Sequence, residues 1–248
     1  MQNIYDLNNI LKPSLKHTKN LECQVEAINN LEKFRWDTLL TKEPETIEWI
    51  RNMDESSKLL DIGANIGIYS LTAIVRGIDS VIAFEPYREN YLSLCRNIDK
   101  NNLKNIFPFN LAVGTIPKAL NFNQTECIAG MAEFDQKEFY HFDNTTVLMM
   151  NINDLKPFPF HGITHLKIDV DGPEFDVLNS CKSILLSESI QSILIEVTLG
   201  DSDKLVDDKL LKFGFKKDIY YEQFRPHSMQ RREQEIANKA RNHVYIKN

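Results

Sequence analysis

The sequence predicts an α/β fold in which helices cover both faces of a mostly parallel sheet. Residues 59–70, LLDIGANIGIYS, combine a short apolar run, an acid, two closely spaced glycines and a helical apolar pattern. This order is typical of a buried strand, a tight turn and the first turn of a helix. The runs 81–84 and 193–197 are apolar throughout, as expected for strands that are buried on both faces.

The remaining elements alternate between strands and helices along the chain. Strands are expected at 58–62, 80–84, 106–113, 164–169, 190–197, 215–222 and 243–247. Helices are expected at 67–76, 88–101, 174–181 and 203–213, and a further helix begins at Pro44. The long connection before the last strand favours a reversed hairpin at the sheet edge.

The chain is expected to form one main domain, 44–248, with an N-terminal helical cap or lid at 1–43. Leu21, Val25, Ile28 and Leu31 have helical spacing in that first segment. The stretch 115–160 interrupts the strand–helix rhythm. We interpret it as an insertion that contains a short β-hairpin, with TTVLMMNINDL as one arm.

Composition restricts the class of protein. The 248 residues carry a net charge of −6, with 42% apolar and 26% charged residues, which is ordinary for a globular protein. The negative charge argues against a nucleic-acid partner. The four cysteines lie far apart, without a C-x-x-C motif. Neither a signal peptide nor a membrane-spanning segment is recognisable, so a cytoplasmic protein is expected, with its oligomeric state open and a homodimer included.

The glycine spacing of the turn indicates a ligand without a pyrophosphate. The order Gly63-Ala64-Asn65-Ile66-Gly67-Ile68 lacks the second and third glycines of the dinucleotide-binding pattern. S-adenosylmethionine has no phosphate groups, so it does not require those glycines. We expect the turn N–H groups to face its carboxylate.

Two acids at neighbouring strand ends suit the same ligand. Asp61 ends the first strand and could accept a hydrogen bond from the ammonium group of S-adenosylmethionine. Glu85 ends the second strand and could accept both ribose hydroxyls.

The segment HLKIDVDGPEFDVL, 165–178, places four ionisable residues at the carboxyl end of a buried strand, namely Lys167, Asp169, Asp171 and Glu174. Ligands bind at this edge of open α/β sheets. A structural alternative is a buried Lys167–Asp169 ion pair with the two following acids capping a helix. Glu196 ends the next apolar strand at the same edge.

The chain resembles the FkbM family of S-adenosylmethionine-dependent O-methyltransferases from about residue 40 to the C-terminus. The resemblance is carried by LLDIGANIGIYS, FEPYRENYLSLCRNIDKNN, NLAVG and LKIDVDGPEFDVL followed by ILIEV. It implies a seven-stranded, Rossmann-like class I methyltransferase fold and methyl transfer to a hydroxyl. The cofactor-binding residues it implies are Asp61, Gly63, Ala64, Asn65, Gly67, Glu85, Pro86, Asn110, Ala112 and Asp169.

Methyl transfer to an alcohol requires a base, and Asp169 is the first candidate. Lys167, if neutral, is the second, and His165 is the third, although a histidine at that position is more typical of a hydrogen-bonded core. Asp171 belongs to the same candidate catalytic group. A metal-assisted version, in which Asp169, Asp171 and Glu196 hold Mg²⁺, is open but not favoured, and full activity in EDTA would rule it out.

The acceptor is expected to be a small molecule with a hydroxyl, a sugar or nucleotide-linked sugar of a surface polysaccharide or secondary metabolite. Glu174, Glu196 and Arg231 are the candidate substrate-binding residues. The Arg231→Ala variant should then raise the acceptor KM without changing cofactor affinity. The alternatives are an NAD-dependent sugar-modifying enzyme and a non-catalytic cofactor-binding scaffold.

Overall fold

The computed structural model describes residues 3–11, 22–122, 145–155, 160–170, 172–198, 200–225 and 240–248. Among these residues the main sheet has seven strands. Their spatial order is β11-β12-β10-β9-β3-β4-β5. The bounds are β3 Lys58–Ile62, β4 Ser80–Phe84, β5 Ile106–Phe109, β9 His165–Ile168, β10 Ser192–Thr198, β11 Phe215–Lys217 and β12 Ala240–Lys247. β12 runs antiparallel between β10 and β11, whereas the other neighbouring pairs are parallel. The expected reversed hairpin at the sheet edge is confirmed.

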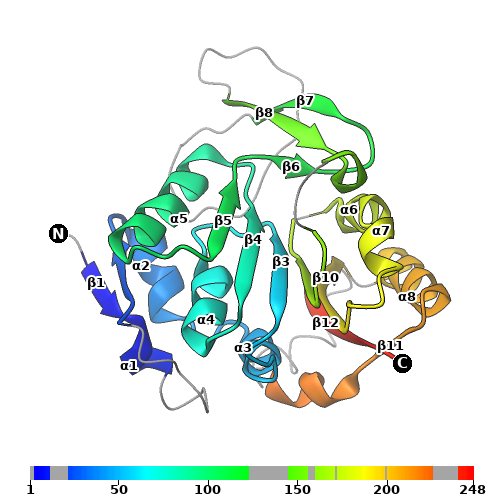
Figure 1. The fold of residues 1–248 in the computed structure, drawn as a ribbon, viewed down its shortest axis with the longest axis horizontal. Helices are drawn as coiled ribbons and strands as arrows, with labels where there is room; N and C mark the ends of the chain where they lie inside the picture. Colours follow the sequence, from blue (N-terminus) through cyan, green and yellow to red (C-terminus); the bar gives the residue numbers. More distant parts are fainter. Residues whose placement is uncertain are drawn as a thin grey trace.

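Two hydrophobic cores lie on opposite faces of this sheet. In β4, Val81 and Ala83 belong to one core, whereas Ile82 and Phe84 belong to the other. This alternation explains the uninterrupted apolar runs of the sequence. The first core is covered by α3 Pro44–Arg51, α4 Ile68–Arg76 and α5 Arg88–Lys100, and the second by α6 Glu174–Ser180, α7 Lys182–Leu185 and α8 Asp201–Lys212. Figure 1 shows the two groups of helices on either side of the strands.

The N-terminal segment contains strands as well as helices. β1 Asn3–Asp6 pairs antiparallel with β2 Gln24–Ala27, and α1 Leu7–Leu11 and α2 Asn30–Asp37 complete the described part. The helix predicted from the spacing of Leu21 to Leu31 is therefore wrong around Val25. The reason is backbone pairing, because β2 forms hydrogen bonds with β1. The Asn97 side chain of α5 also binds β2, with its Oδ1 accepting from the N–H of Glu26 at 2.8 Å.

A separate three-stranded sheet follows β5. It consists of β6 Ala112–Val113, β7 Lys118–Phe122 and β8 Thr145–Met150, in the order β6-β8-β7. β7 and β8 are antiparallel, so the predicted hairpin is confirmed, while residues 123–144 lie outside the description. Figure 1 shows this small sheet beyond one end of the main sheet.

Two predicted strands are shorter than expected. The strand at 106–113 is split after Phe109, where the Asn110 side chain donates to the carbonyls of Glu85 and Pro86 at 2.9 Å each and turns the chain away. The strand at 215–222 ends at Lys217, because Asp218 caps the 3₁₀ helix η2 Ile219–Phe224. A shorter 3₁₀ helix, η1 Ile152–Asp154, follows β8. Across the described ranges, no helix has the length and apolar character needed to cross a membrane.

Candidate active site

The turn between β3 and α4 is fastened to the end of β4. The N–H groups of Gly63 and Ala64 both donate to the carbonyl of Phe84, at 2.9 and 3.0 Å. The N–H of Asn65 donates to Glu85 Oε2 at 2.7 Å. Gly63 and Asn65 have φ angles of 83° and 52°, which the glycine adopts readily and asparagine tolerates.

The next two N–H groups of the turn also have acceptors within the protein. Ile66 donates to Asn65 Oδ1 at 2.9 Å, and Gly67 donates to the carbonyl of Ala64 at 2.9 Å. Our expectation that the N–H groups of this turn face the carboxylate of the methyl donor is therefore wrong for residues 63–67. The same bonds leave no N–H cradle for a pyrophosphate there, because such a cradle needs unoccupied donors.

Glu85 is the carboxylate that holds the turn in place. Besides the bond from Asn65, its Oε1 accepts from the N–H of Tyr87 at 2.8 Å. Its side chain is buried on the wall of a pocket, and burial raises the pKa of Glu85 to about 7 against the opposing effect of these N–H groups. Oε1 also accepts from Asn90 Nδ2 at 3.5 Å, so the lone pair that remains for a ligand hydroxyl is on Oε2.

Asp61 lies beneath this pocket rather than on its wall. Its Oδ2 accepts from Ser70 Oγ at 2.6 Å, while no partner for Oδ1 occurs among the described atoms. Burial raises the pKa of Asp61, and the nearby Lys167 ammonium opposes that shift. Asp61 is thus a counter-charge to Lys167 and is not among the residues that line the pocket, and its contact with the cofactor stays a prediction.

Lys167 and Asp169 form an ion pair at the end of β9, with Nζ 2.7 Å from Oδ2. Burial by itself lowers the pKa of Lys167, but the carboxylates of Asp169, Asp61 and Glu43 outweigh it and raise that pKa. Burial likewise acts to raise the pKa of Asp169, but the Lys167 ammonium holds it below its usual value. Lys167 is thus charged, which contradicts its candidacy as a neutral base. The Tyr69 ring lies against the ammonium, 5.0 Å from centroid to Nζ.

His165 lies deeper in the same strand and is a core residue. Its Nδ1 is 2.7 Å from Ser192 Oγ and its Nε2 is 3.2 Å from Ser57 Oγ. Burial lowers the pKa of His165 to about 4. Its hydrogen bonds and its distance from the strand end support the structural interpretation of this histidine.

A single pocket gathers most of the residues that the sequence indicated. Those on its wall are Gly63, Ala64, Asn65, Glu85, Pro86, Ala112, Lys167, Asp169 and Glu196. Gly67 and Asn110 do not line it, since Gly67 packs against Leu94 and Asn110 bonds the backbone after β4. Glu174 accepts from the N–H of Gly172 at 2.6 Å and also lies off the wall. Asp171 and Arg231 fall outside the described residues.

Sequence reasoning missed the wall contributed by the N-terminal segment. Arg35, Thr38, Leu39, Lys42 and Glu43 line the pocket together with residues of β6 and β8. Their spacing is that of one helical face, but the mixture of charged and apolar side chains produces no hydrophobic periodicity. Tyr69 was also missed, although it lies within the glycine-turn motif.

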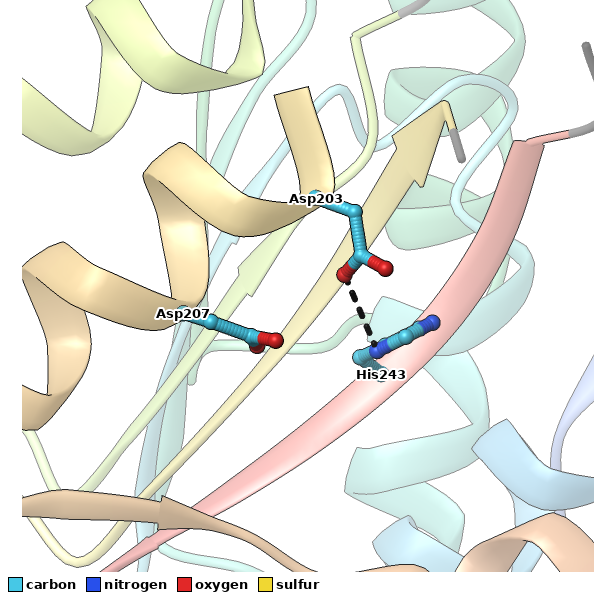
Figure 2. A group of neighbouring side chains, drawn as sticks. All are labelled: Asp203, Asp207 and His243. Carbon is cyan, nitrogen blue, oxygen red and sulfur yellow. Dashed lines mark ion pairs between the residues drawn. The ribbon is translucent and has the colours of Figure 1, made fainter. Parts of the chain in front are cut away.

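Among the described residues, a close group of potential metal ligands lies away from this pocket. Figure 2 shows Asp203, Asp207 and His243 facing one another between α8 and β12. Lys217 Nζ already contacts Asp203 at 3.2 Å and Asp207 at 2.9 Å. Burial and Lys217 lower the pKa of His243 to about 4. The two acids accordingly share one lysine as their ion-pair partner, and a metal would have to displace that ammonium.

The chain is similar to solved methyltransferase structures. The methyltransferase domain of METTL16 is 11% identical over 97% of this chain and 77% of that chain, with a TM-score of 0.50. M. jannaschii TYW2 in complex with AdoMet is 13% identical over 92% of this chain and 83% of that chain, with a TM-score of 0.48. No curated protein matches the sequence. The sheet order, the helices on both faces and the pocket at the strand ends define a class I methyltransferase-like fold.

The particular family follows from the sequence. The methyltransferase FkbM domain matches residues 61–217, which is more than half of the chain. The protein belongs to the FkbM methyltransferase family, and its cofactor is S-adenosyl-L-methionine.

Proposed function

We propose that the protein transfers a methyl group from S-adenosylmethionine to a hydroxyl of a small molecule, a sugar or nucleotide-linked sugar of a surface polysaccharide or secondary metabolite. The observation that carries the proposal is the Lys167–Asp169 pair, whose carboxylate stands on the pocket wall with a quarter of its side chain exposed. The net charge of −6 supports a small acceptor over a nucleic acid.

The residues of the pocket fit the cofactor. The β3–α4 turn, with its N–H groups bonded internally, suits a ligand without phosphate. Glu85 offers buried acceptor capacity for ribose hydroxyls, and Leu111, Ala112 and Val113 offer an apolar wall for the adenine. S-adenosylmethionine supplies an electrophilic methyl group when bound. These arguments disfavour the NAD-dependent alternative, which needs a pyrophosphate site.

Asp169 is assigned as the acceptor of the hydroxyl proton. As the oxygen of the acceptor forms its new bond to carbon, its O–H becomes strongly acidic, so a carboxylate of low pKa is basic enough to remove the proton. Lys167 holds that carboxylate at the strand end and keeps it ionised. Asp171, the remaining member of the candidate catalytic group, stays a proposal, as does the substrate-binding role of Glu174, Glu196 and Arg231.

The Asp169→Asn variant tests the proposal. Its turnover rate at saturating S-adenosylmethionine should fall by about 10²–10⁴-fold. Asp208→Asn, on the exposed face of α8, is the matched control and should leave turnover unchanged. Full turnover by Asp169→Asn would contradict the assigned role, and loss of wild-type activity in EDTA would instead support the metal-assisted alternative.

A further inference from the structure

A second pocket lies beside the cofactor pocket, between the start of α3 and the first residues of β12. Lys42, Glu43 and Glu196 line both pockets, so the two share a wall. Asp169 lines the first pocket. A molecule seated in the second pocket therefore borders the space in which the proposed methyl transfer takes place.

The charges around the second pocket balance. Three carboxylates line it, those of Glu43, Glu45 and Glu196, and three cationic side chains line it, those of Lys42, Arg225 and Arg241. An excess of either sign would favour an ion of the opposite charge. The balance instead favours a neutral ligand that forms hydrogen bonds.

Two residues that line this pocket each carry a buried oxygen atom with unfilled capacity to accept hydrogen bonds. Glu45 is 4% exposed and Asn242 is 5% exposed, and neither Glu45 Oε2 nor Asn242 Oδ1 has a partner among the described atoms. Asn242 Nδ2 donates to Glu43 Oε2 at 3.1 Å and to Glu45 Oε1 at 3.3 Å, so the donor of this group is already used. A buried acceptor without a donor destabilises the ligand-free protein, so a donor supplied by a ligand is favourable.

We propose that the second pocket is the acceptor subsite, and that it holds a glycosyl unit whose hydroxyls donate to Glu45 and Asn242. Neighbouring hydroxyls of a sugar ring supply uncharged donors, which is what two adjacent acceptors in a charge-balanced pocket require. The inference rests on the proposed function, because it assigns the binding site of that reaction's acceptor. It makes Glu45 and Asn242 specificity-determining residues that do not touch the transferred methyl group.

The Glu45→Gln variant separates this role from a structural one. Glutamine keeps the size of the side chain and an oxygen for Asn242, but places an N–H₂ donor where the sugar hydroxyl would donate. The probes are the methyl α-glycosides of glucose, galactose and mannose, with methyl transfer followed by mass spectrometry. We expect kcat/KM for the accepted glycoside to fall about tenfold or more, as for loss of a hydrogen bond to a charged group. Affinity for S-adenosylmethionine and the unfolding midpoint should be maintained.

The control is Glu188→Gln, a matched change at an exposed residue away from both pockets, which should behave as the wild type. Equal kcat/KM for Glu45→Gln and wild type would overturn the subsite and leave the proposed function standing. A wild-type protein that binds S-adenosylmethionine but methylates none of the glycosides would contradict the proposed sugar acceptor itself.

A crystal structure of the wild type with S-adenosylhomocysteine and the accepted glycoside gives a measurement independent of any variant. A sugar hydroxyl within hydrogen-bond distance of Glu45 supports the proposal. A glycoside bound elsewhere, with only water beside Glu45, overturns it.

Discussion

The backbone oxygen of Asp169 lies directly against Gly63, so a Cβ added at residue 63 would be 1.8 Å from that oxygen. The N–H of Asp169 in turn donates to the carbonyl of Ile62 at 3.0 Å. The glycine turn and the acidic strand end are therefore one assembled unit, although they are far apart in sequence. This contact brings the proposed base beside the cofactor turn.

Replacing Gly63 by alanine should disrupt this unit. Gly214 provides a matched control, because it has the same φ of 83° and nothing within 4 Å of an added Cβ. The Gly214→Ala variant should lose about 1–2 kcal/mol of unfolding free energy, the cost of the left-handed backbone alone. Gly63→Ala should lose clearly more and should bind S-adenosylmethionine weakly, as measured by urea unfolding and calorimetric titration. Equal losses in the two variants would show that the contact with Asp169 relaxes freely.

The Lys167–Asp169 pair should show energetic coupling. Removing one partner leaves the other charge poorly compensated at a largely buried site. The losses of unfolding free energy in the two single variants should therefore sum to more than the loss in the double variant. In a double-mutant cycle of Lys167→Met and Asp169→Asn, we expect a coupling of about 1–3 kcal/mol in unfolding free energy. A coupling close to zero would mean that Asp61 alone balances the lysine.

Cofactor affinity should depend on pH through Glu85. Burial raises the pKa of Glu85 to about 7, and ribose hydroxyls are donors that favour the carboxylate over the neutral acid. Below that pH binding must release the Glu85 proton, so affinity should fall by about tenfold per pH unit between pH 7 and 5. Calorimetry in buffers of different ionisation enthalpy should detect the released proton at pH 6 in the wild type and not in Glu85→Gln. Identical proton release by both proteins would assign it to another group.

His165 should act on stability and leave the pH profile of turnover unchanged. Burial lowers its folded-state pKa from 6.5 to about 4, so the unfolded chain takes up a proton before the folded protein does. The stability that neutral His165 contributes is present above pH 6.5 and is lost as the pH falls towards 4, by up to ~3 kcal/mol. The difference in unfolding free energy between wild type and His165→Gln should shrink over this range. A difference that does not vary with pH would show that His165 is not buried as a neutral group.

The sequence predicted the sheet well because its signals are local. The apolar strands, the glycine turn and the acids at strand ends each depend on residues that are adjacent in the chain. The pocket wall formed by Arg35, Lys42 and Glu43 depends instead on how the N-terminal segment packs against α5, which no local pattern encodes. The burial of Asp61 beneath the pocket was equally hidden, because it depends on Lys167, the residue paired with Asp61 in the neighbouring strand.

The central claim is that the pocket at the ends of β3, β4 and β9 binds S-adenosylmethionine through the Glu85-anchored turn. Calorimetric titration of the wild type and Glu85→Gln with S-adenosylmethionine, and of the wild type with NAD, tests it most directly. We predict saturable binding of one S-adenosylmethionine to the wild type, weaker binding to the variant and no binding of NAD. Saturable binding of NAD, or equal affinity of both proteins for S-adenosylmethionine, would contradict this account.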